Sequence, residues 1–366
     1  MAEQIDVSKL REWLEEERPV TVLDVRLDED REQWSIPGSI HVNAYEDLKA
    51  GRRDLFSDVS FPIGVPVVTV CNRGIVSEIA AKQLVGAGLS AVSLQGGMQA
   101  WSMAWNTAEM GFPQMRVIQV RRTGKGCLSY VLCSGNEAIV IDPSLELELY
   151  VDLAEQRDVR IRYVLDTHIH ADHLSRSKPL AEMTGAELWL PQQHRVHFPY
   201  LPLEDGTELR FGDSVLKAIH TPGHTCESTC YFVDRQALFT GDTLFLSGVG
   251  RPDLHADAAQ ASERAAQLYH SLKRILALES STWIFPGHTS EPVSFDREVL
   301  TARLGDVATR LHDWLLSEQS FTAKIVSRIP PTPPNYTQIT ELNETGEKPN
   351  IDLAELEAGA NRCAVS

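Results

Sequence analysis

The sequence predicts an α/β domain followed by a β-rich sandwich or barrel to which helices are added. Three observations lead to this fold class. A chain of 366 residues favours two or three domains over one. Its first hundred residues alternate short apolar runs with helical patterns, and from Met115 the pattern changes to paired strands. Hydrophobic residues make up 43% of the chain and charged residues 23%, so a sizeable core is available.

The first domain is placed at residues 1–107. Its apolar runs are short and rich in β-branched residues, which is typical of buried strands, and the helical run between them ends at Gly86. Residues 105–113 show no clear period and are expected to form a linker. The predicted strands and the helix lie at residues 19–25, 66–71, 77–86 and 91–94.

The second domain is placed at residues 115–295. Its first two strands are separated only by the residues SGNE, which predicts a hairpin connection. The third strand leads directly into a histidine-rich loop. The predicted strands lie at residues 128–132, 138–141, 161–165, 186–190, 214–219, 229–233 and 237–239.

Residues 296–366 are expected to form a C-terminal extension packed on the second domain. An amphipathic helix is predicted there, because apolar residues recur at intervals of three and four from Leu300 to Leu315. A contact between two copies of the chain in a homodimer is the alternative role for this apolar stripe. The segment 329–350 is rich in Pro, Asn and Thr and is expected to be extended and turn-forming, not helical.

Composition disfavours several classes of partner and location. The formal net charge of −17 repels nucleic acid and anionic membrane surfaces. No stretch approaches the roughly 20 apolar residues of a membrane-spanning helix, and acidic residues near the start disfavour a secretory signal. Six cysteines are too sparse and irregular for a disulfide scaffold. We expect a soluble, cytoplasmic protein with reduced thiols.

Cys71 ends an apolar strand and opens the segment CNRGIVSE, which leads into the predicted helix. Backbone N–H groups of a tight loop and of a helix N-terminus favour a thiolate, and such a loop would cradle an anionic persulfide. A buried structural cysteine at a strand end is the alternative. The residues alone leave both interpretations open.

Four elements in this region resemble a single rhodanese domain. They are VLDVR at 22–26, IPGSIHVN at 36–43, the Cys71 loop with its helix, and LQGGMQAW at 94–101. The resemblance implies that Cys71 accepts a sulfane sulfur as a persulfide and passes it to a nucleophile. Arg73 lies in the same loop, and Val76 stands where the family frequently has an arginine.

A second group of chemistry-bearing residues follows the strands of the second domain. Each cluster lies in a turn-rich loop at a strand end, and imidazole and carboxylate ligands suit zinc, iron or manganese. A single such histidine is more often a core residue, but seven residues in four clusters favour metal binding. They are His168, His170, Asp172 and His173 in DTHIHADH, His224 in TPGHT, Asp242 in FTGDT and His288 in FPGHT.

This ordered set resembles the metallo-β-lactamase superfamily, which implies an αββα sandwich with metal at one edge. The superfamily's full set would give His168, His170 and His224 to one metal and Asp172, His173 and His288 to a second, with Asp242 between them. Ala171, the segment GVGRPDL with Arg251 and Asp253, and the terminal AGANRCAVS around Cys363 resemble more narrowly the persulfide dioxygenases related to the ethylmalonic encephalopathy protein.

The narrower resemblance implies one Fe(II) per chain, held by His168, His224 and Asp242. Two histidines and one carboxylate form a facial triad with open positions, so iron can hold a persulfide and dioxygen side by side. His170, Asp172, His173 and His288 would then surround the ligands or hold a second metal.

Other residues near these clusters have open or minor roles. Arg251 is expected to pair either with a carboxylate of a glutathione-like substrate or with Asp253. Thr289 stands where the family often has an aspartate. Cys226 and Cys230 lack two further ligands nearby and are read as small residues of a loop and a strand.

The leading hypothesis is an enzyme that moves sulfane sulfur through Cys71 and oxidises a thiol persulfide, of glutathione or a similar thiol, to sulfite. Its small-molecule partners would be the persulfide, dioxygen, and sulfite or thiosulfate. One alternative is a zinc or two-metal thioester hydrolase of the hydroxyacylglutathione hydrolase type. Another is a non-catalytic sensor of persulfides in which the metal domain is only a scaffold.

Overall fold

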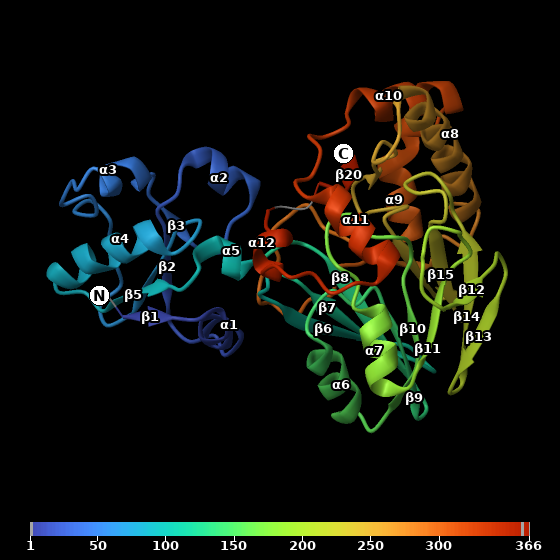
Figure 1. Cartoon of the computed structure of the whole chain (residues 1–366), viewed down its shortest axis with the longest axis horizontal. Coiled ribbons are helices and arrows are strands. Elements are labelled where there is room, and N and C mark those ends of the chain that lie inside the picture. The colour runs from blue at the N-terminus through green and yellow to red at the C-terminus, as the bar shows by residue number, and fades with distance from the viewer. Residues whose placement is uncertain (1–2, 360–361, 366) are drawn as a thin grey trace.

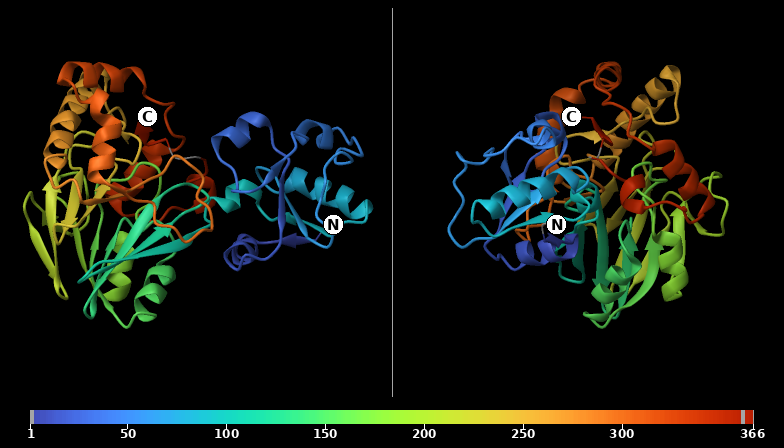
Figure 2. Two further views of the ribbon diagram at one scale, coloured as in Figure 1. Left: turned by 180° about the vertical axis from the view of Figure 1, so that it is seen from behind. Right: turned by 60° about the vertical axis from the view of Figure 1, so that its left-hand side comes forward.

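The computed structural model describes residues 3–359 and 362–365 as a small N-terminal domain beside a larger sandwich (Figure 1). The C-terminal residues return to the side of the sandwich that faces the first domain, as the view from behind also shows (Figure 2). No helix within these two stretches of chain has both the length and the apolar character needed to cross a membrane.

The first domain is a five-stranded parallel sheet with helices on both faces. Its strand order is β1-β5-β4-β2-β3. One layer of the core packs Leu23 and Val67 against α3 and α4, and the other packs Val68 against α1 and α5. The strands are β1 (Gln4–Ile5), β2 (Thr21–Asp24), β3 (Ile40–His41), β4 (Val67–Val70) and β5 (Ala91–Leu94). The helices are α1 (Val7–Glu15), α2 (Asp28–Gln33), α3 (Tyr45–Lys49), α4 (Ile75–Gly86) and α5 (Gly97–Trp101).

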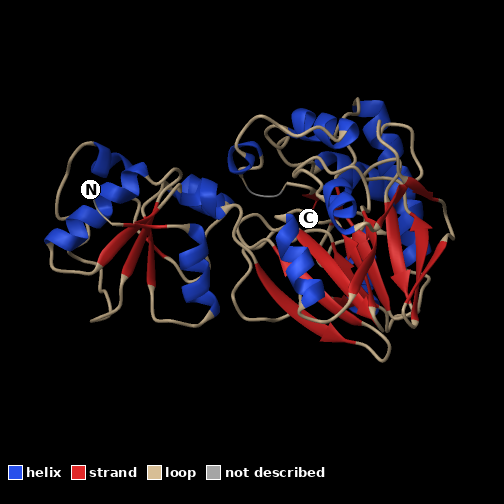
Figure 3. Ribbon diagram, turned by 60° about the horizontal axis from the view of Figure 1, so that its bottom comes forward, coloured by secondary structure: helices blue, strands red, loops and turns tan. Residues whose placement is uncertain are grey.

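The second domain consists of two mixed sheets packed face to face, with helices outside each sheet (Figure 3). The seven-stranded sheet has the order β12-β11-β10-β9-β8-β7-β6, and the six-stranded sheet has the order β13-β14-β15-β16-β18-β19. Their strands are β6 (Asn106–Gly111), β7 (Arg116–Arg121), β8 (Leu128–Ser134), β9 (Glu137–Ile141), β10 (Arg160–Leu165), β11 (Glu187–Pro191), β12 (Leu201–Leu203), β13 (Glu208–Phe211), β14 (Ser214–His220), β15 (Thr229–Val233), β16 (Ala237–Gly241), β18 (Trp283–Pro286) and β19 (Ala302–Arg303). A separate pair joins β17 (Val249–Gly250) to β20 (Ala364–Val365).

Three hydrophobic clusters separate the four layers of this sandwich. The inner faces of the sheets meet around Tyr130, Phe239 and Phe285. The outer face of the larger sheet packs on α6 (Leu147–Glu155) and α7 (Ser177–Thr184), and that of the smaller sheet packs on α8 (Ala258–Ile275), α9 (Leu304–Leu311) and α10 (Glu318–Ser327). The αββα layering expected from the sequence is therefore confirmed, as are all the strands predicted for both domains.

The segment 105–113 is not the unstructured linker that the sequence predicts. It contains β6, whose residues Asn106–Gly111 pair antiparallel with Arg121–Arg116 of β7. The segment has little hydrophobic patterning, so its strand conformation comes from the backbone hydrogen bonds of a neighbouring strand. Asn106 also accepts a hydrogen bond from Arg121 Nε at 2.7 Å.

The expectation of an extended tail at 329–350 is wrong, because α11 (Tyr336–Thr345) lies within it. Thr340 donates its hydroxyl to the carbonyl of Tyr336, so its side chain is satisfied inside the helix. Ile339 packs in a small cluster with Leu174 and Leu356, and Gly346 ends the helix in a left-handed conformation. Tertiary packing overrides the weak local propensity here. The last helix is α12 (Leu353–Leu356).

The amphipathic helix predicted from the stripe between Leu300 and Leu315 is present but shorter. It forms α9, and a single 3-10 turn (His312–Trp314) follows it. Leu304, Val307 and Leu311 are buried against α8, while Leu300 lies before the helix. The 18-residue α8 has no counterpart among the predicted elements, although Asp257 and Gln260 form a capping box at its start.

Candidate metal centre and reactive cysteine

All four sequence clusters of histidine and aspartate meet at one edge of the sandwich. His168 follows β10, His224 follows β14, Asp242 follows β16 and His288 follows β18. The strands β16 and β18 are parallel neighbours with Gly241 beside Pro286, so Asp242 and His288 leave the sheet together. The metal-binding residues predicted from the sequence are thus brought into one buried region.

His168, His224 and Asp242 form a compact group whose ligand atoms all lie within 4.8 Å of one another. The Nε2 atoms of His168 and His224 lie 4.0 and 3.7 Å from Asp242 Oδ2. Oδ2 is buried and has no hydrogen-bond partner among the described residues. A buried, unpaired carboxylate oxygen that faces two imidazole nitrogens is the arrangement expected of a metal site.

In each triad histidine the second ring nitrogen, Nδ1, is held in place by a polar contact. His168 Nδ1 lies 2.9 Å from the hydroxyl of Thr167, and His224 Nδ1 donates to the carbonyl of Arg251 at 2.7 Å. Such contacts fix the ring orientation of metal-binding histidines. Gly250 is required beside them, because a Cβ atom there would lie 2.0 Å from the carbonyl oxygen of Asp242.

The electrostatics of the triad favour a metal ion over protons. Burial, together with the neighbouring His170, lowers the pKa of His168 well below its usual value, and burial also lowers the pKa of His224. Burial by itself raises the pKa of Asp242, but His288 and the two triad histidines outweigh it and hold that pKa below its usual range. The triad therefore presents two neutral nitrogens and one carboxylate at neutral pH, the forms that bind a metal.

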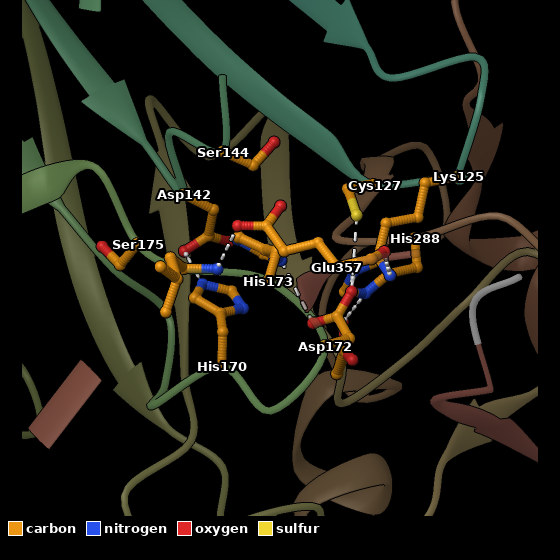
Figure 4. Close-up of polar contacts among 12 residues, drawn as sticks. Lys125, Cys127, Asp142, Ser144, His170, Asp172, His173, Ser175, His288 and Glu357 are labelled. Atoms are coloured by element: carbon orange, nitrogen blue, oxygen red, sulfur yellow. Dashed lines mark hydrogen bonds and ion pairs between the residues drawn. The ribbon is translucent and has the colours of Figure 1, made fainter. Parts of the chain in front are cut away.

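Asp172, His173 and His288 gather with Cys127 in a second buried group within 4.8 Å (Figure 4). His288 lies between two carboxylates, with Nδ1 2.5 Å from Asp242 Oδ1 and Nε2 2.9 Å from Asp172 Oδ2. His173 Nδ1 lies 3.1 Å from Asp172 Oδ1, and Cys127 Sγ lies 3.3 Å from Asp172 Oδ2. The three residues that the sequence predicts for a second metal are thus close together.

The second group differs from the triad in its protonation. Burial by itself lowers the pKa of His173, but Asp172 and Cys127 outweigh it and raise that pKa to about 10. Burial opposes the charge on His288 as well, yet Asp242 and Asp172 raise the pKa of His288 well above its usual value. At neutral pH these imidazoles hold protons shared with carboxylates, and a metal ion would have to displace them.

His170 lies beside the triad but faces another pair of carboxylates. Its Nε2 lies 3.1 Å from Asp142 Oδ1 and 3.9 Å from Asp166 Oδ1, whereas its buried Nδ1 has no partner (Figure 4). Asp142 also accepts hydrogen bonds from the backbone N–H and the hydroxyl of Thr167. Asp142 therefore fixes both the loop backbone before His168 and the ring of His170.

The structure resolves the two alternatives for Arg251 in favour of the internal ion pair. The guanidinium is completely buried, with Nε and Nη2 both 2.8 Å from the carboxylate of Asp253. Nη1 donates to the carbonyls of Pro331 and Arg362. Arg251 and Asp253 thus hold the chain terminus beside the triad, and this geometry favours the ion pair over a contact with a substrate carboxylate.

Two cysteines beside the proposed metal-binding residues have positions that sequence spacing does not indicate. Cys127 precedes β8 and forms an isolated backbone bridge with His288. Cys363 is buried, and its thiol lies within 4.8 Å of ligand atoms of Asp242 and His288. The strand β20 pairs with β17, and the N–H of Arg251 donates a hydrogen bond to the carbonyl of Cys363. These contacts hold Cys363 beside Asp242 and His288. In the sequence, only the family-like terminal segment AGANRCAVS indicates a role for Cys363.

Cys71 lies at the end of β4 and points its thiol at the start of α4. The buried Sγ accepts from the backbone N–H of Ser77 at 3.4 Å and from its hydroxyl at 3.3 Å. The loop rests on the start of α5, where Met98 N–H donates to the carbonyl of Cys71. Gly97 has a φ of +58°, and a Cβ atom there would lie 2.1 Å from that carbonyl oxygen.

Arg73 lies in the same loop but does not face the thiol. Its side chain is 70% exposed, and its guanidinium lies 4.0 Å from Glu355 in α12. The helix α12 packs on α5, so the C-terminal extension reaches both the Cys71 loop and the metal centre. Cys226 is exposed and Cys230 is buried. Within residues 3–359 and 362–365, neither belongs to a group of side chains that could hold a metal ion.

Comparison with known families agrees with this architecture. Residues 122–288 match the family model of the metallo-β-lactamase superfamily. Residues 6–104 match that of the rhodanese-like domain.

Curated relatives match less than half of the chain. The chain is 31% identical over 162 residues to the probable polyketide biosynthesis zinc-dependent hydrolase BaeB of Bacillus velezensis, covering 43% of this chain and 69% of that protein. It is 34% identical over 161 residues to a hydroxyacylglutathione hydrolase of Francisella philomiragia, covering 43% of this chain. That match spans 61% of the Francisella enzyme, less than two thirds of its length.

Two solved structures resemble the chain over more than the sandwich sheets. A metallo-β-lactamase from Staphylococcus aureus has a TM-score of 0.57 and 26% identity, covering 64% of this chain and 74% of that one. ETHE1 from Myxococcus xanthus has a TM-score of 0.55 and 26% identity, covering 63% of this chain and 98% of that one.

Proposed function

Because this chain belongs to the metallo-β-lactamase superfamily and carries a rhodanese-like domain, we propose that it oxidises a thiol persulfide to sulfite and transfers sulfane sulfur through Cys71. The thiol is glutathione or a similar small molecule. The reaction uses one Fe(II) per chain, bound by His168, His224 and Asp242. The likeness to ETHE1 and the presence of a sulfur-transfer domain on the same chain support this choice of chemistry.

The single observation that carries the proposal is the contrast between the two groups of metal-binding residues. The triad has lowered histidine pKa values and an unpaired carboxylate oxygen, so it is ready for a metal at neutral pH. The second group has raised histidine pKa values and is linked through Asp172, although the buried Nε2 of His173 also has no hydrogen-bond partner among the described residues. One metal held by two histidines and one carboxylate leaves open positions, as an iron oxygenase requires.

The residues of the chain supply positioning and charge balance for this reaction. Fe(II) in the triad would bind the persulfide and dioxygen together and activate dioxygen against the terminal sulfur. Overall, one persulfide, one dioxygen and one water give one thiol, one sulfite and two protons. Thr167 and the carbonyl of Arg251 keep the triad imidazoles in place throughout. His288 and Asp172, already linked by a hydrogen bond, offer a route for the protons that leave.

Sulfur transfer at Cys71 uses a separate mechanism. The Cys71 thiolate attacks the outer sulfur of a donor persulfide, the S–S bond breaks, and the donor leaves as a thiolate. The N–H and hydroxyl of Ser77 stabilise negative charge at Sγ before and after this step. Sulfite can then attack the outer sulfur of the Cys71 persulfide to give thiosulfate and return the thiolate.

Dioxygen uptake tests the proposed oxidation directly. Protein loaded with iron without air should consume dioxygen when glutathione persulfide or another small-molecule persulfide is added, and it should form an equal amount of sulfite. Folded, iron-loaded protein that consumes no dioxygen with any persulfide tested would contradict the proposal.

A two-metal thioester hydrolase is the second candidate, favoured by the clustering of Asp172, His173 and His288. Relatives named hydroxyacylglutathione hydrolase point the same way. Such an enzyme would use a metal-bound hydroxide as its nucleophile. About two zinc ions per chain at neutral pH together with hydrolysis of S-lactoylglutathione would favour the hydrolase over the dioxygenase.

A further inference from the structure

A cavity of about 470 Å³ opens beside the metal centre. It lies between α7, the end of β11 and α11, and its lining includes His168, Ile169 and His170. Its volume is in the range of small-molecule sites. Since His168 belongs to the triad, a molecule in this cavity can contact one residue of the proposed metal site.

The walls of the cavity are mainly apolar. They come from both the sandwich and the C-terminal extension, so α11 and the segment after it complete the site. Asn343 of α11 donates to the carbonyls of His170 and His173, which ties this wall to the ligand loop. The principal apolar side chains are Leu188, Leu190, Val196, Phe198, Leu342 and Ile351.

Two positive charges line the interior of the cavity, and one of them is already paired with a carboxylate. Arg176 is buried, donates to the carbonyl of Leu174 at 2.8 Å and pairs with Glu357 at 3.3 Å. The ammonium of Lys178 lies 5.0 Å from the centre of the Phe198 ring and 3.4 Å from the carbonyl of Gly346. A ligand carboxylate inside would find only the Lys178 ammonium as a cationic partner among the described lining residues, and a second carboxylate would have none there, which is costly in an apolar site.

The exposed rim adds a negative field. Glu146, Glu182 and Glu347 lie there, and Lys348 is the exposed cation among the described lining residues. This balance opposes the entry of an anion and tolerates an uncharged molecule. Glutathione carries two carboxylates and one ammonium group, so its charge fits this cavity poorly.

One polar group on the wall has a free donor. Gln193 accepts hydrogen bonds from the N–H groups of Arg195 and Val196 through Oε1, whereas its buried Nε2 has no partner in the part of the chain that the structure describes. Buried donors of this kind normally find an acceptor. A carbonyl oxygen of an amide-containing ligand would satisfy it.

We propose that this cavity binds the arm of the thiol that carries the persulfide, and that this arm is uncharged, mostly apolar and amide-containing, as in pantetheine. The inference rests on the proposed function, because it assigns the substrate class of the same metal centre. The sulfur end lies toward His168, and the arm passes between α7 and α11. An amide carbonyl of the arm accepts from Gln193 Nε2.

Calorimetric titration of the full-length protein with pantetheine and with glutathione tests the binding step without turnover. Pantetheine should bind at least about tenfold more tightly than glutathione. Leu342→Glu, which places a charge in the wall, should weaken pantetheine binding by about tenfold or more, and Gln193→Ala should weaken it by about threefold to tenfold. Leu316→Glu is the matched control, because Leu316 is 67% exposed and lies outside the cavity.

The second variant keeps the test valid if Leu342→Glu fails to fold. Val196→Glu also charges the wall, and melting temperatures of both variants are compared with that of Leu316→Glu. Equal affinity for pantetheine and glutathione, or pantetheine binding unchanged by both folded wall variants, would overturn the inference.

Dioxygen uptake with pantetheine persulfide and with glutathione persulfide separates this inference from the proposed function. We expect a lower KM for pantetheine persulfide than for glutathione persulfide. The wall variants should raise the KM for pantetheine persulfide and change kcat little. Uptake with a lower KM for glutathione persulfide keeps the proposed function and overturns the cavity assignment. If the wall variants weaken pantetheine binding but neither persulfide causes dioxygen uptake, the result supports the ligand class and contradicts the proposed function.

Discussion

His224 donates a hydrogen bond from Nδ1 to the backbone carbonyl of Arg251 at 2.7 Å. The same arginine is completely buried and holds Asp253 and the carbonyl of Arg362 through its guanidinium. One residue thus orients a ligand of the triad through its backbone and anchors the chain terminus through its side chain. The stability of this segment and the geometry of the metal site are therefore linked.

Arg251→Met should lower stability more than it changes substrate affinity. The substitution leaves the carboxylate of Asp253 unpaired, and removing one partner of a buried ion pair costs about 3–5 kcal/mol, less here because Asp253 is partly exposed. Urea denaturation measures the loss, and Arg235→Met, at an exposed pair with Glu279, should change stability little. Unchanged stability with a raised KM for the persulfide would instead place Arg251 at the substrate.

His224→Ala and Asp242→Ala should each lose bound metal and dioxygen uptake together. Each removes a donor from a three-residue group, and the remaining two leave too few protein ligands for tight binding. Metal content of the purified variants and oxygen-electrode traces measure both losses. His312→Ala, at an exposed position, is the control. Full iron content in either triad variant would remove the triad assignment.

Metal stoichiometry should depend on pH. His168 and His224 have lowered pKa values, so the triad binds metal across neutral pH, whereas His173 and His288 have raised values and keep their protons there. Metal competes with those protons, so a rise in pH favours the second site. We expect about one metal per chain at pH 6–7.5, with a second equivalent binding as the pH approaches the pKa of His173 at about 10. Two tightly bound equivalents at pH 6 would contradict this expectation.

The clustering of the proposed metal-binding residues could be predicted from the sequence because each follows a short, mainly apolar strand and lies in a turn marked by Gly, Pro or Asp. Strand ends at one sheet edge place such side chains together, as Asp242 and His288 illustrate. The fold classes of both domains are predictable for a related reason, since their strands are short, apolar and regularly spaced.

Other features depend on contacts that the sequence does not reveal. The strand β6 exists through its pairing with β7, and α11 exists through burial of Ile339 beside Leu174. Cys127 reaches the second metal group through a bridge to His288, which lies 161 positions later along the chain. The sequence does not show whether Arg251 pairs with Asp253 or with a substrate carboxylate. The burial of the guanidinium in the structure favours Asp253.

Cys71→Ser should end sulfur transfer to sulfite while leaving dioxygen uptake largely intact. Its thiol lies in a loop of the first domain, away from the described residues of the metal groups, and a hydroxyl cannot carry the sulfane sulfur. Thiosulfate formation from sulfite and a persulfide measures the first activity. Cys133→Ser is a matched control, because that thiol is also buried and burial raises its pKa to about 11. Loss of both activities in a folded Cys71 variant would show that the two sites are obligately coupled.

Glu357→Ala should be among the most destabilising single substitutions in the C-terminal extension. The carboxylate is fully buried, lies 2.5 Å from Arg122 Nη1 and 3.3 Å from Arg176 Nη2, and accepts from the N–H of Leu174 at 3.0 Å. Its loss leaves the completely buried Arg122 without its carboxylate, and breaking such a pair costs about 3–5 kcal/mol.

The pH dependence of this contribution has a definite sign. Burial by itself raises the pKa of Glu357, but Arg122 and Arg176 outweigh it and hold that pKa below the usual value. A carboxylate with a depressed pKa in the folded state stabilises the protein above its unfolded pKa of about 4.3, and this stabilisation is lost as the pH falls further. Denaturation of wild type and Glu357→Gln should therefore differ most at neutral pH and converge in acid. The exposed neighbour Glu355, substituted by Ala, is the control. If Glu357→Gln were as stable as the wild type at pH 7, the buried charge would contribute nothing that an uncharged amide cannot supply.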